Sequence, residues 1–253
     1  MTLAIVNPGL MGDVLYCLPA ARWLCEQAGD LCDFHTTSYC HPLKRLLEAQ
    51  HFIRHVVYYP EGMDWWADPP LNGYAAHHTL RIQGPGDLTG SLRDTFAAKA
   101  GAPAGLPIRY DLPGIMGITD PPAQRFVVVA PSGIAGRAGF SQRPVLYEFV
   151  HVSPWPVVQV GGVGDYVGEL PACGLDRTGL DFLDTAPWML AASCFVGPIS
   201  SQLALAEGFD IPKIVVDDGN WRSMRDVIRT PRHRYLANPS VAALLQCVSE
   251  AMQ

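Results

Sequence analysis

The sequence lacks the long apolar runs that membrane insertion and secretion require. A transmembrane helix needs about 20 consecutive apolar residues, and no run in the chain approaches that length. The amino terminus has no basic segment followed by a long apolar core, which is the pattern of a secretory signal. We therefore predict a cytoplasmic protein without a membrane span.

Motifs of several common enzyme classes are also missing. No GxSxG, HExxH or GxxxxGK(S/T) motif occurs, which argues against serine hydrolases, zinc proteases and P-loop nucleotide triphosphatases. The 7 cysteines form no CxxC pair, so free thiols in a reducing compartment are the simplest interpretation. The spacing of Cys40, His41, His51 and His55 fits no familiar zinc site. We expect neither a metal nor a bound cofactor.

Charge is scarce, and its balance is negative. The chain carries 18 Lys and Arg against 24 Asp and Glu, a formal net charge of -6. A broad nucleic-acid surface normally needs clustered basic residues, so this balance argues against one. A small local basic patch is still predicted near the end of the chain, where five arginines gather: Arg222, Arg225, Arg229, Arg232 and Arg234.

Apolar residues, by contrast, are abundant and follow a regular pattern. Of the 253 residues, 49% are hydrophobic, which is enough for two domains with sizeable cores. In the first half, apolar runs predict strands at 3–6, 31–36 and 55–59, and helical patterns fall at 14–28, 42–49 and 91–100. In the second half, strands are predicted at 126–130, 157–160, 195–196 and 213–216, and helices at 145–152, 185–193, 203–208 and 240–252. This alternation is typical of an α/β fold with parallel sheets.

Two stretches interrupt the alternation. Residues 60–90 show little periodicity, and residues 102–124 are dense in proline and glycine, which favours a domain boundary. We predict two Rossmann-like domains, one over 1–115 and one over 125–237. The last helix, within 238–253, is expected to pack back on the first domain.

The first candidate site is the stretch Asn7–Ala20, after the first predicted strand. Gly9 and Gly12 permit a sharp turn and a close approach of the backbone to a ligand. Such turns lie at the carboxyl ends of strands, where α/β proteins bind their ligands. Asp13 adds a carboxylate at the mouth of the turn. Capping of the following helix is the ordinary alternative role for this residue.

The second candidate site is the stretch Gly197–Gln202, before the helical pattern at 203–208. Its backbone N–H groups and the hydroxyls of Ser200 and Ser201 suit a phosphate group. A serine N-cap after a tight turn would give the same pattern.

Other residues in the second half also suit a phosphorylated ligand. Arg137 and Arg143 follow the strand at 126–130, and a guanidinium can bind phosphate oxygens with two hydrogen bonds; ordinary solvated arginines are the alternative. Gly161 and Gly162 form a glycine-rich turn after a strand. This turn is a weak dinucleotide signal, because it does not match GxGxxG.

In the first half, aromatic residues lie within the stretch that has little periodicity. Trp65 and Trp66 are adjacent, and His77 is followed by His78. Tryptophan faces stack on sugar and base rings, but they also serve simply as packing.

The opening stretch resembles the amino-terminal signature of the heptosyltransferase-like glycosyltransferases, glycosyltransferase family nine. A short strand, a loop ending in Gly12-Asp13-Val14, then Leu18-Pro19-Ala20 and a helix carry the likeness. The second half carries it as well, because the segments on either side of Gly197–Gln202 match those around the family's donor-diphosphate loop. Ile199 and Ala204 depart from the family pattern, which has an acid and a histidine there.

The resemblance implies two Rossmann-like domains that face each other across a cleft, the GT-B architecture, with a role for each candidate residue. Asp13 would be the catalytic base, and the residues beside the acceptor would be Gly12, Trp65, Trp66 and His77. The donor diphosphate would be held by Gly197, Ser200, Ser201 and Gln202, and neutralised by Arg143 or Arg137. Gly161 and Gly162 would lie beside the donor base. Glu207 would bind the ribose hydroxyls, unless it is an ordinary solvated helix residue.

Together these features predict an inverting, metal-independent glycosyltransferase that uses a nucleotide-diphosphate sugar as its co-substrate. Asp13 would take a proton from the acceptor hydroxyl, and direct displacement would invert the sugar carbon. The acceptor would be a surface saccharide or a hydroxylated base in DNA. The terminal arginines and Trp65-Trp66 suit DNA, whereas the negative charge opposes it. The alternative, which Ile199 and Ala204 favour, is a non-catalytic nucleotide- or sugar-binding domain.

Overall fold

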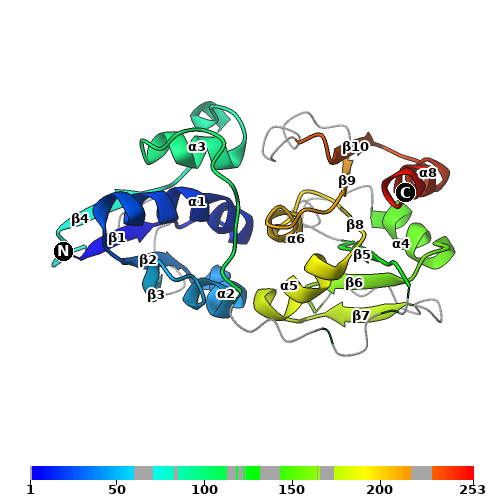
Figure 1. Cartoon of the computed structure of the whole chain (residues 1–253), viewed down its shortest axis with the longest axis horizontal. Coiled ribbons are helices and arrows are strands. Elements are labelled where there is room, and N and C mark those ends of the chain that lie inside the picture. The colour runs from blue at the N-terminus through cyan, green and yellow to red at the C-terminus, as the bar shows by residue number, and fades with distance from the viewer. Residues whose placement is uncertain are drawn as a thin grey trace. The chain divides into compact units, whose positions relative to one another are not determined.

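The computed structural model describes residues 2–59, 71–82, 85–112, 118, 122, 124–131, 143–163, 165, 174–217 and 230–253. The chain divides into two units, each built on its own sheet (Figure 1). Unit 1 contains the described residues of Met1–Gly114, and unit 2 contains those of Ile115–Met224 and Arg229–Gln253. The predicted α/β class with two parallel sheets is confirmed.

Unit 1 has a sheet of four parallel strands in the order β3-β2-β1-β4. Its strands are β1 (Leu3–Val6), β2 (Cys32–Thr37), β3 (Ile53–Tyr59) and β4 (Ala76–Thr79). Its helices are α1 (Met11–Ala28), η1 (Ser38–Leu43), α2 (Lys44–Glu48), η2 (Pro85–Asp87) and α3 (Leu92–Lys99). β1 and β2 are buried along their whole length, as the inner strands of a parallel sheet are.

Helix α1 begins earlier than the sequence predicts, at Met11 rather than Val14. Leu10 is its N-cap residue and is extended, so Asp13 lies in the first turn of the helix and not at the cap. The helix ends as predicted at Gly29, whose φ of 61° is left-handed and whose N–H donates to the last helical carbonyls. Glycine favours this termination because it has no Cβ to strain.

The stretch predicted to be irregular contains a strand. β4 pairs with β1 in parallel, with Ala4 opposite His77 and Val6 opposite Thr79. Its sequence is AHHT, which offers no apolar run. An edge strand has one neighbour and needs no continuous apolar pattern.

Unit 2 has a sheet of six parallel strands in the order β10-β9-β8-β5-β6-β7. Its strands are β5 (Val127–Val129), β6 (Val157–Gly161), β7 (Leu175–Thr178), β8 (Cys194–Gly197), β9 (Lys213–Asp217) and β10 (His233–Ala237). Its helices are α4 (Arg143–Val152), α5 (Phe182–Ala191), α6 (Ser201–Ala206) and α8 (Val241–Ala251). The two strands that the sequence did not predict, β7 and β10, are both edge strands.

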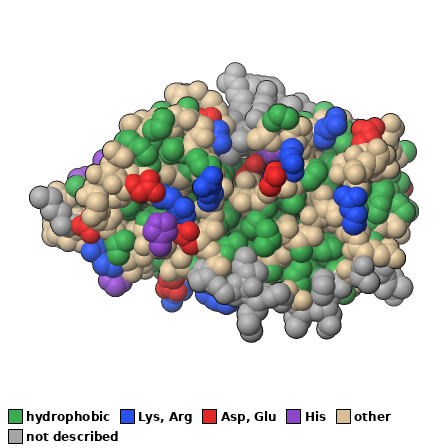
Figure 2. Space-filling model, viewed as in Figure 1, with side chains coloured by type: hydrophobic (Ala, Val, Ile, Leu, Met, Phe, Trp, Pro, Cys, Tyr) green, Lys and Arg blue, Asp and Glu red, His purple; other side chains and the backbone are tan. Residues whose placement is uncertain are grey.

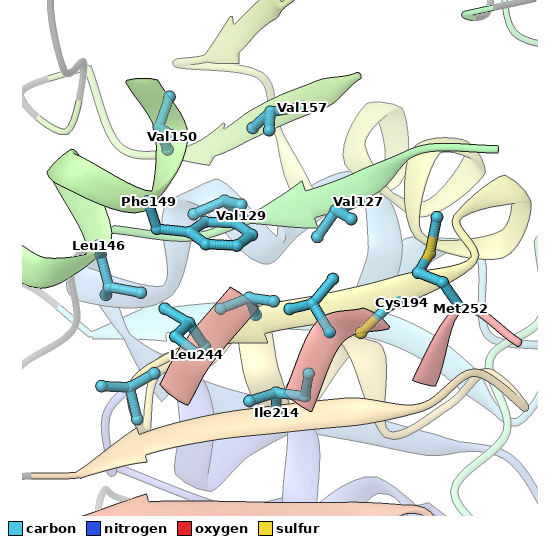
Figure 3. Packing of buried hydrophobic residues seen from close by; sticks show 13 residues of the cluster. Val127, Val129, Leu146, Phe149, Val150, Val157, Cys194, Ile214, Leu244 and Met252 are labelled. Carbon is cyan, nitrogen blue, oxygen red and sulfur yellow. The ribbon is translucent and has the colours of Figure 1, made fainter. Parts of the chain in front are cut away.

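The core of unit 2 lies between one face of this sheet and the helices α4 and α8 (Figure 3). Val127 and Val129 of β5 point into it, with Phe149 of α4 beside them. Each fully buried side chain of this size contributes about 1.5–3 kcal/mol. The cluster also contains Leu146, Val150, Val157, Cys194, Val196, Ile214, Val216, Leu244, Val248 and Met252.

The last helix belongs to unit 2. The buried face of α8, formed by Leu244 and Val248, is part of the core of unit 2, together with Met252 just after the helix. The packing of residues 238–253 on the first domain stays a prediction. An amphipathic pattern shows that a helix has a buried face, but it does not show which partner covers that face.

Two further findings concern the described residues of both units. Within the described ranges, no helix is long and apolar enough to cross a membrane. The described cysteines are free thiols, as predicted.

Candidate functional site

Each sheet has one point at which the strand order reverses. In unit 1, β1 lies between β2 and β4; in unit 2, β5 lies between β6 and β8. The chain therefore leaves β1 and β5 toward one side and later returns on the other. Ligands of open α/β sheets bind at the carboxyl ends of the strands that flank this reversal. The loop after β1 starts at Asn7, and the loop after β8 runs through 198–200, so both candidate stretches lie at reversal points.

In the loop after β1, Asp13 makes a helix-terminal hydrogen bond. The Leu10 N–H donates to Asp13 Oδ2 at 2.9 Å. This bond satisfies one of the donors that a helix start leaves without a partner, so Asp13 supports the helix start from its third position and is not the N-cap residue that the sequence suggested. It also holds the carboxylate at the carboxyl end of β1.

Gly9 lies against Asp13 with no space between them. A Cβ at Gly9 would lie 2.6 Å from Asp13 Cβ and 2.8 Å from Asp13 Oδ2. Asn7 closes the other side of the loop, because its Oδ1 accepts a hydrogen bond from Gly9 N at 2.9 Å. The loop therefore requires glycine at this position for a steric reason.

Two buried thiols lie near this loop. Cys40 of η1 donates to Gly9 O at 3.5 Å, and burial raises its pKa to about 11. Burial also raises the pKa of the Cys17 thiol in α1 far above its usual range. Both thiols are therefore uncharged near neutral pH, and they add no negative charge beside Asp13.

Two of the other residues predicted for the acceptor side are described by the structure. Gly12 lies within the first turn of α1 rather than in a loop. His77 is exposed on β4, in the strand that pairs with β1 on the side of the reversal. Trp65 and Trp66 lie outside the described residues.

In unit 2, Gly197 ends β8 against the neighbouring strand. A Cβ there would lie 2.8 Å from Ala130 O and 3.0 Å from Phe195 Cζ. Ala130 N donates to Val196 O at 2.9 Å, which keeps the two strand ends together. Only glycine fits, and Gly197 is buried against Ala130, just after β5.

The residues after Gly197 begin α6. Ser200 is its N-cap, and the Ser200 Oγ accepts a hydrogen bond from Leu203 N at 3.1 Å. Ser201 is half-buried and opens the helix. Gln202 is buried, and its Oε1 has no hydrogen-bond partner in the described part of the chain. The serine N-cap is thus formed, and a buried amide oxygen beside it is without a partner.

Glu207, at the far end of α6, is not a solvated residue. Its side chain is 3% exposed, and its Oε1 lies 2.9 Å from Nε2 of His233, whose side chain is fully buried. Thr230 N donates to His233 Nδ1 at 3.3 Å, so Nε2 carries the proton that points to Glu207. Binding of a ribose by Glu207 would require this pair to open.

The glycine turn after β6 is closed by an acid. Gly161 has a φ of 142°, and a Cβ there would collide with the Asp165 side chain. The Asp165 carboxylate accepts a hydrogen bond from Gly162 N at 2.6 Å. Arg137 lies outside the described residues. Arg143 is the first residue of α4, and its side chain is also outside the description.

Charge of one sign does not gather on the face of the molecule drawn in Figure 2. The described Lys and Arg side chains there lie near Asp and Glu side chains. Of the arginines predicted to form a basic patch, Arg232 binds Asp210 at 3.0 Å and Arg234 is exposed. Arg222, Arg225 and Arg229 lie outside the described residues. Among the residues described, no group of three metal-ligating side chains is close enough to hold an ion.

Sequence reasoning missed the roles of Asn7 and His233. An asparagine two residues before a glycine, directly after a strand, is a recognisable turn signal, so the Asn7 contact could have been expected. His233 offered no such signal, because it is 26 residues from Glu207 and lies on an edge strand.

No protein-family model matches the chain, and no curated protein sequence does. Solved structures do. The E. coli ADP-heptose lipopolysaccharide heptosyltransferase II matches with a TM-score of 0.71 at 10% identity, over 100% of this chain and 98% of that one. The family 9 glycosyl transferase from Veillonella parvula matches with a TM-score of 0.63 at 10% identity, over 99% and 97%.

A third match is longer than this chain. The iron-containing dodecameric glycosyltransferase TibC from enterotoxigenic E. coli matches with a TM-score of 0.62 at 18% identity. The match covers 94% of this chain but 63% of TibC. At these identities the likeness concerns the fold. The protein has the GT-B fold of family-nine glycosyltransferases, as the resemblance in the sequence predicts.

Proposed function

We propose that this protein is an inverting, metal-independent glycosyltransferase. It moves a sugar from a nucleoside-diphosphate sugar to an acceptor hydroxyl. One observation carries the proposal: on a GT-B fold, each of the two candidate stretches lies at the strand-order reversal of its own sheet. One of them offers a carboxylate, and the other offers the backbone N–H groups at the start of α6.

Unit 2 would bind the donor. The donor diphosphate would lie at the loop after β8, where N–H groups at the start of α6 favour anions. Gln202 would form a hydrogen bond to the ligand through its buried amide. Arg143, or Arg137 as the alternative, would neutralise the departing diphosphate. The turn at Gly161 and Gly162 would lie beside the nucleobase.

Unit 1 would bind the acceptor and supply the base. Asp13 takes the proton of the acceptor hydroxyl as its oxygen forms a bond to the anomeric carbon. The bond from that carbon to the diphosphate oxygen breaks at the same time, and the leaving electron pair stays on the phosphate. Attack opposite the leaving group inverts the configuration. Gly12 and His77, with Trp65 and Trp66, would contact the acceptor.

A saccharide acceptor is favoured over DNA. The Arg232 guanidinium is bound to Asp210, and basic and acidic side chains are interspersed on the face in Figure 2. Phosphate backbones bind to clustered, unpaired cations. The heptosyltransferase II structure is named for an ADP-heptose donor, so ADP-sugars are the first donors to test.

A non-catalytic binding domain is the second candidate. Ile199 and Ala204 replace the acid and the histidine of the resembling family, and the Ser200 hydroxyl is engaged as a helix cap. Such a domain would bind a nucleotide sugar and release no product.

Donor turnover separates the two candidates. The protein is incubated with ADP-, GDP-, UDP- and dTDP-sugars and a panel of saccharide and hydroxymethylated-DNA acceptors, with EDTA present, and released nucleoside diphosphate is measured. We expect release that depends on the acceptor. Binding by thermal shift without release from any pair would support the binding domain and overturn the enzyme.

A further inference from the structure

One buried amide links the parts of the loop that holds Asp13. Asn7 is 1% exposed, and its own N–H donates to His35 O at 2.9 Å, which fixes the residue to β2. Its side chain turns toward α1. There Oδ1 accepts from Gly9 N at 2.9 Å, and Nδ2 donates to Asp13 O at 3.5 Å. The amide therefore joins the tip of the loop to the first turn of the helix.

The atoms of this loop are closely packed. The position that a Cβ would take at Gly9 lies 2.8 Å from Asn7 Oδ1 and 2.6 Å from Asp13 Cβ. The Gly9 backbone is thus packed between the Asn7 amide and the Asp13 side chain. Because close-packed atoms transmit displacement, a shift of the amide moves the carboxylate.

We infer that Asn7 is a positioning residue, which fixes the Asp13 carboxylate for proton transfer by holding Gly9 and the first turn of α1. This inference rests on the proposed role of Asp13 as the base. Asn7 itself does not touch the reacting atoms. A displacement of about 1 Å in a reacting group can cost roughly a hundredfold in rate, so the amide contributes to catalysis through Asp13.

Gln50 provides a matched control for the loss of a buried amide. It is 1% exposed, and its amide joins Leu46 O to the backbone of Asp111 through bonds of 2.8–3.2 Å. It lies before β3, at the amino end of that strand. Asn7→Ala and Gln50→Ala should therefore both lower stability, and only Asn7→Ala should lower kcat.

The expected loss for Asn7→Ala is about 10- to 100-fold in kcat, with the donor KM within about twofold of wild type. Gln50→Ala keeps kcat within about twofold. Equal kcat values in Asn7→Ala and wild type would overturn the inference, and so would an equal loss in Gln50→Ala.

Asn7→Asp tests positioning through the pH profile. The aspartate retains an acceptor for Gly9 N, loses the donor to Asp13 O and places a second carboxylate beside Asp13. A neighbouring negative charge opposes ionisation, so the acidic limb of kcat against pH moves to higher pH. The nearby thiols, Cys17 of α1 and Cys40 of η1, stay uncharged and do not obscure this shift. A profile identical to wild type would contradict the inference.

Gly9→Ala gives the same test by steric means, in case the Asn7 variants do not fold. The new methyl group displaces Asp13, and kcat falls at least tenfold. Gly86→Ala is the control, because a Cβ there meets nothing within 4 Å, and its kcat is unchanged. Normal kcat in a folded Gly9→Ala would show that the carboxylate tolerates displacement and overturn the inference.

A separate measurement distinguishes failure of this inference from failure of the proposed function. If the wild-type protein releases no nucleoside diphosphate, the proposed function fails. The Asp13 carboxyl is then titrated by carbon NMR, with its signal assigned from Asp13→Asn. A different titration midpoint in Asn7→Ala, which introduces no charge, supports positioning by Asn7, and an identical midpoint refutes it.

Discussion

The two loops at the strand-order reversals are held by different numbers of side-chain contacts. In unit 1, two side chains fix the loop, because Asn7 binds Gly9 and the Asp13 carboxylate binds Leu10 N. In unit 2, Gly197 packs against Ala130 O with no room for a Cβ, and one side chain, that of Ser200, caps the following helix. A group that transfers a proton needs a fixed position, whereas an anion needs exposed N–H groups. Side-chain changes should therefore affect catalysis in unit 1 and affect binding in unit 2 mainly where they add bulk.

Asp13→Ala tests the unit 1 half of this comparison and should have the largest effect. We expect kcat to fall by about a thousandfold, the range of a lost general base, with donor binding by calorimetry unchanged. Asp94→Ala is the control. Asp94 is also the third residue of its helix, α3, and its carboxylate accepts hydrogen bonds from Ser91 Oγ and Gly105 N.

The control separates capping from catalysis. Loss of the Asp94 bonds should cost about 1–2 kcal/mol of stability without lowering kcat. Full activity in Asp13→Ala would show that Asp13 supports the helix start and takes no part in catalysis. The comparison between the two loops would then be wrong.

His233→Ala tests how α6 is held at the end away from the loop. The change removes the His233 ring, which lies 2.9 Å from a carboxylate that is 3% exposed, and removing one partner of a buried charged group costs about 3–5 kcal/mol. Urea unfolding measures this loss. Arg232→Ala removes the adjacent ion pair with Asp210, which is largely exposed, and should cost less than about 1 kcal/mol. Equal losses of stability in His233→Ala and Arg232→Ala would show that the contact between Glu207 and His233 does not stabilise the protein more than an exposed ion pair does.

Gly197→Ala tests the close packing at the end of β8 in unit 2. Its methyl group meets Ala130 O at 2.8 Å, so we expect a loss of about 1–3 kcal/mol in stability and roughly tenfold weaker donor binding. Gly162→Ala is the control, because its nearest contact would be an ordinary 3.5 Å, and its stability should match wild type. Unaltered donor affinity in Gly197→Ala would remove this glycine from the proposed donor site.

The sequence predicted every inner strand and one edge strand, β3, and missed the other three edge strands. β1, β5 and β8 are continuous apolar runs, as strands buried on both faces must be. The strands that the pattern missed are β4, β7 and β10, with the polar sequences AHHT, LDRT and HRYLA. All are at sheet edges, where solvent satisfies polar side chains.

The candidate site divides in a similar way. Glycines near the ends of strands located both loops, because the need for a turn or a close approach is local. The contact of Glu207 with His233 depends on β10 pairing with β9, and the partner of α8 depends on how the helices of unit 2 pack. Such contacts join residues that are distant in the chain, and no local pattern specifies them.

Asp111 shows that a carboxylate held by many partners need not be at a reversal point. It binds Arg22, the His51 ring and His51 N, before β3 and so at the amino end of that strand. Partial burial raises its pKa, but the His51 hydrogen bonds and the Arg22 charge outweigh this effect and hold the pKa below its usual value. A depressed pKa contributes stability above the unfolded-state value, and that stability is lost as the pH falls through the folded-state value. Asp111→Asn should therefore lower the free energy of unfolding by roughly 1 kcal/mol near neutral pH, with kcat unchanged. This difference from wild type should disappear below about pH 4.

Glu48→Gln is the control, because it breaks an exposed pair with Lys44 at 3.8 Å. In the same urea titrations its free energy of unfolding should match that of wild type at every pH. If the difference in free energy of unfolding between Asp111→Asn and wild type did not depend on pH, packing of the Asp111 side chain, and not its charge, would be the source of the stability.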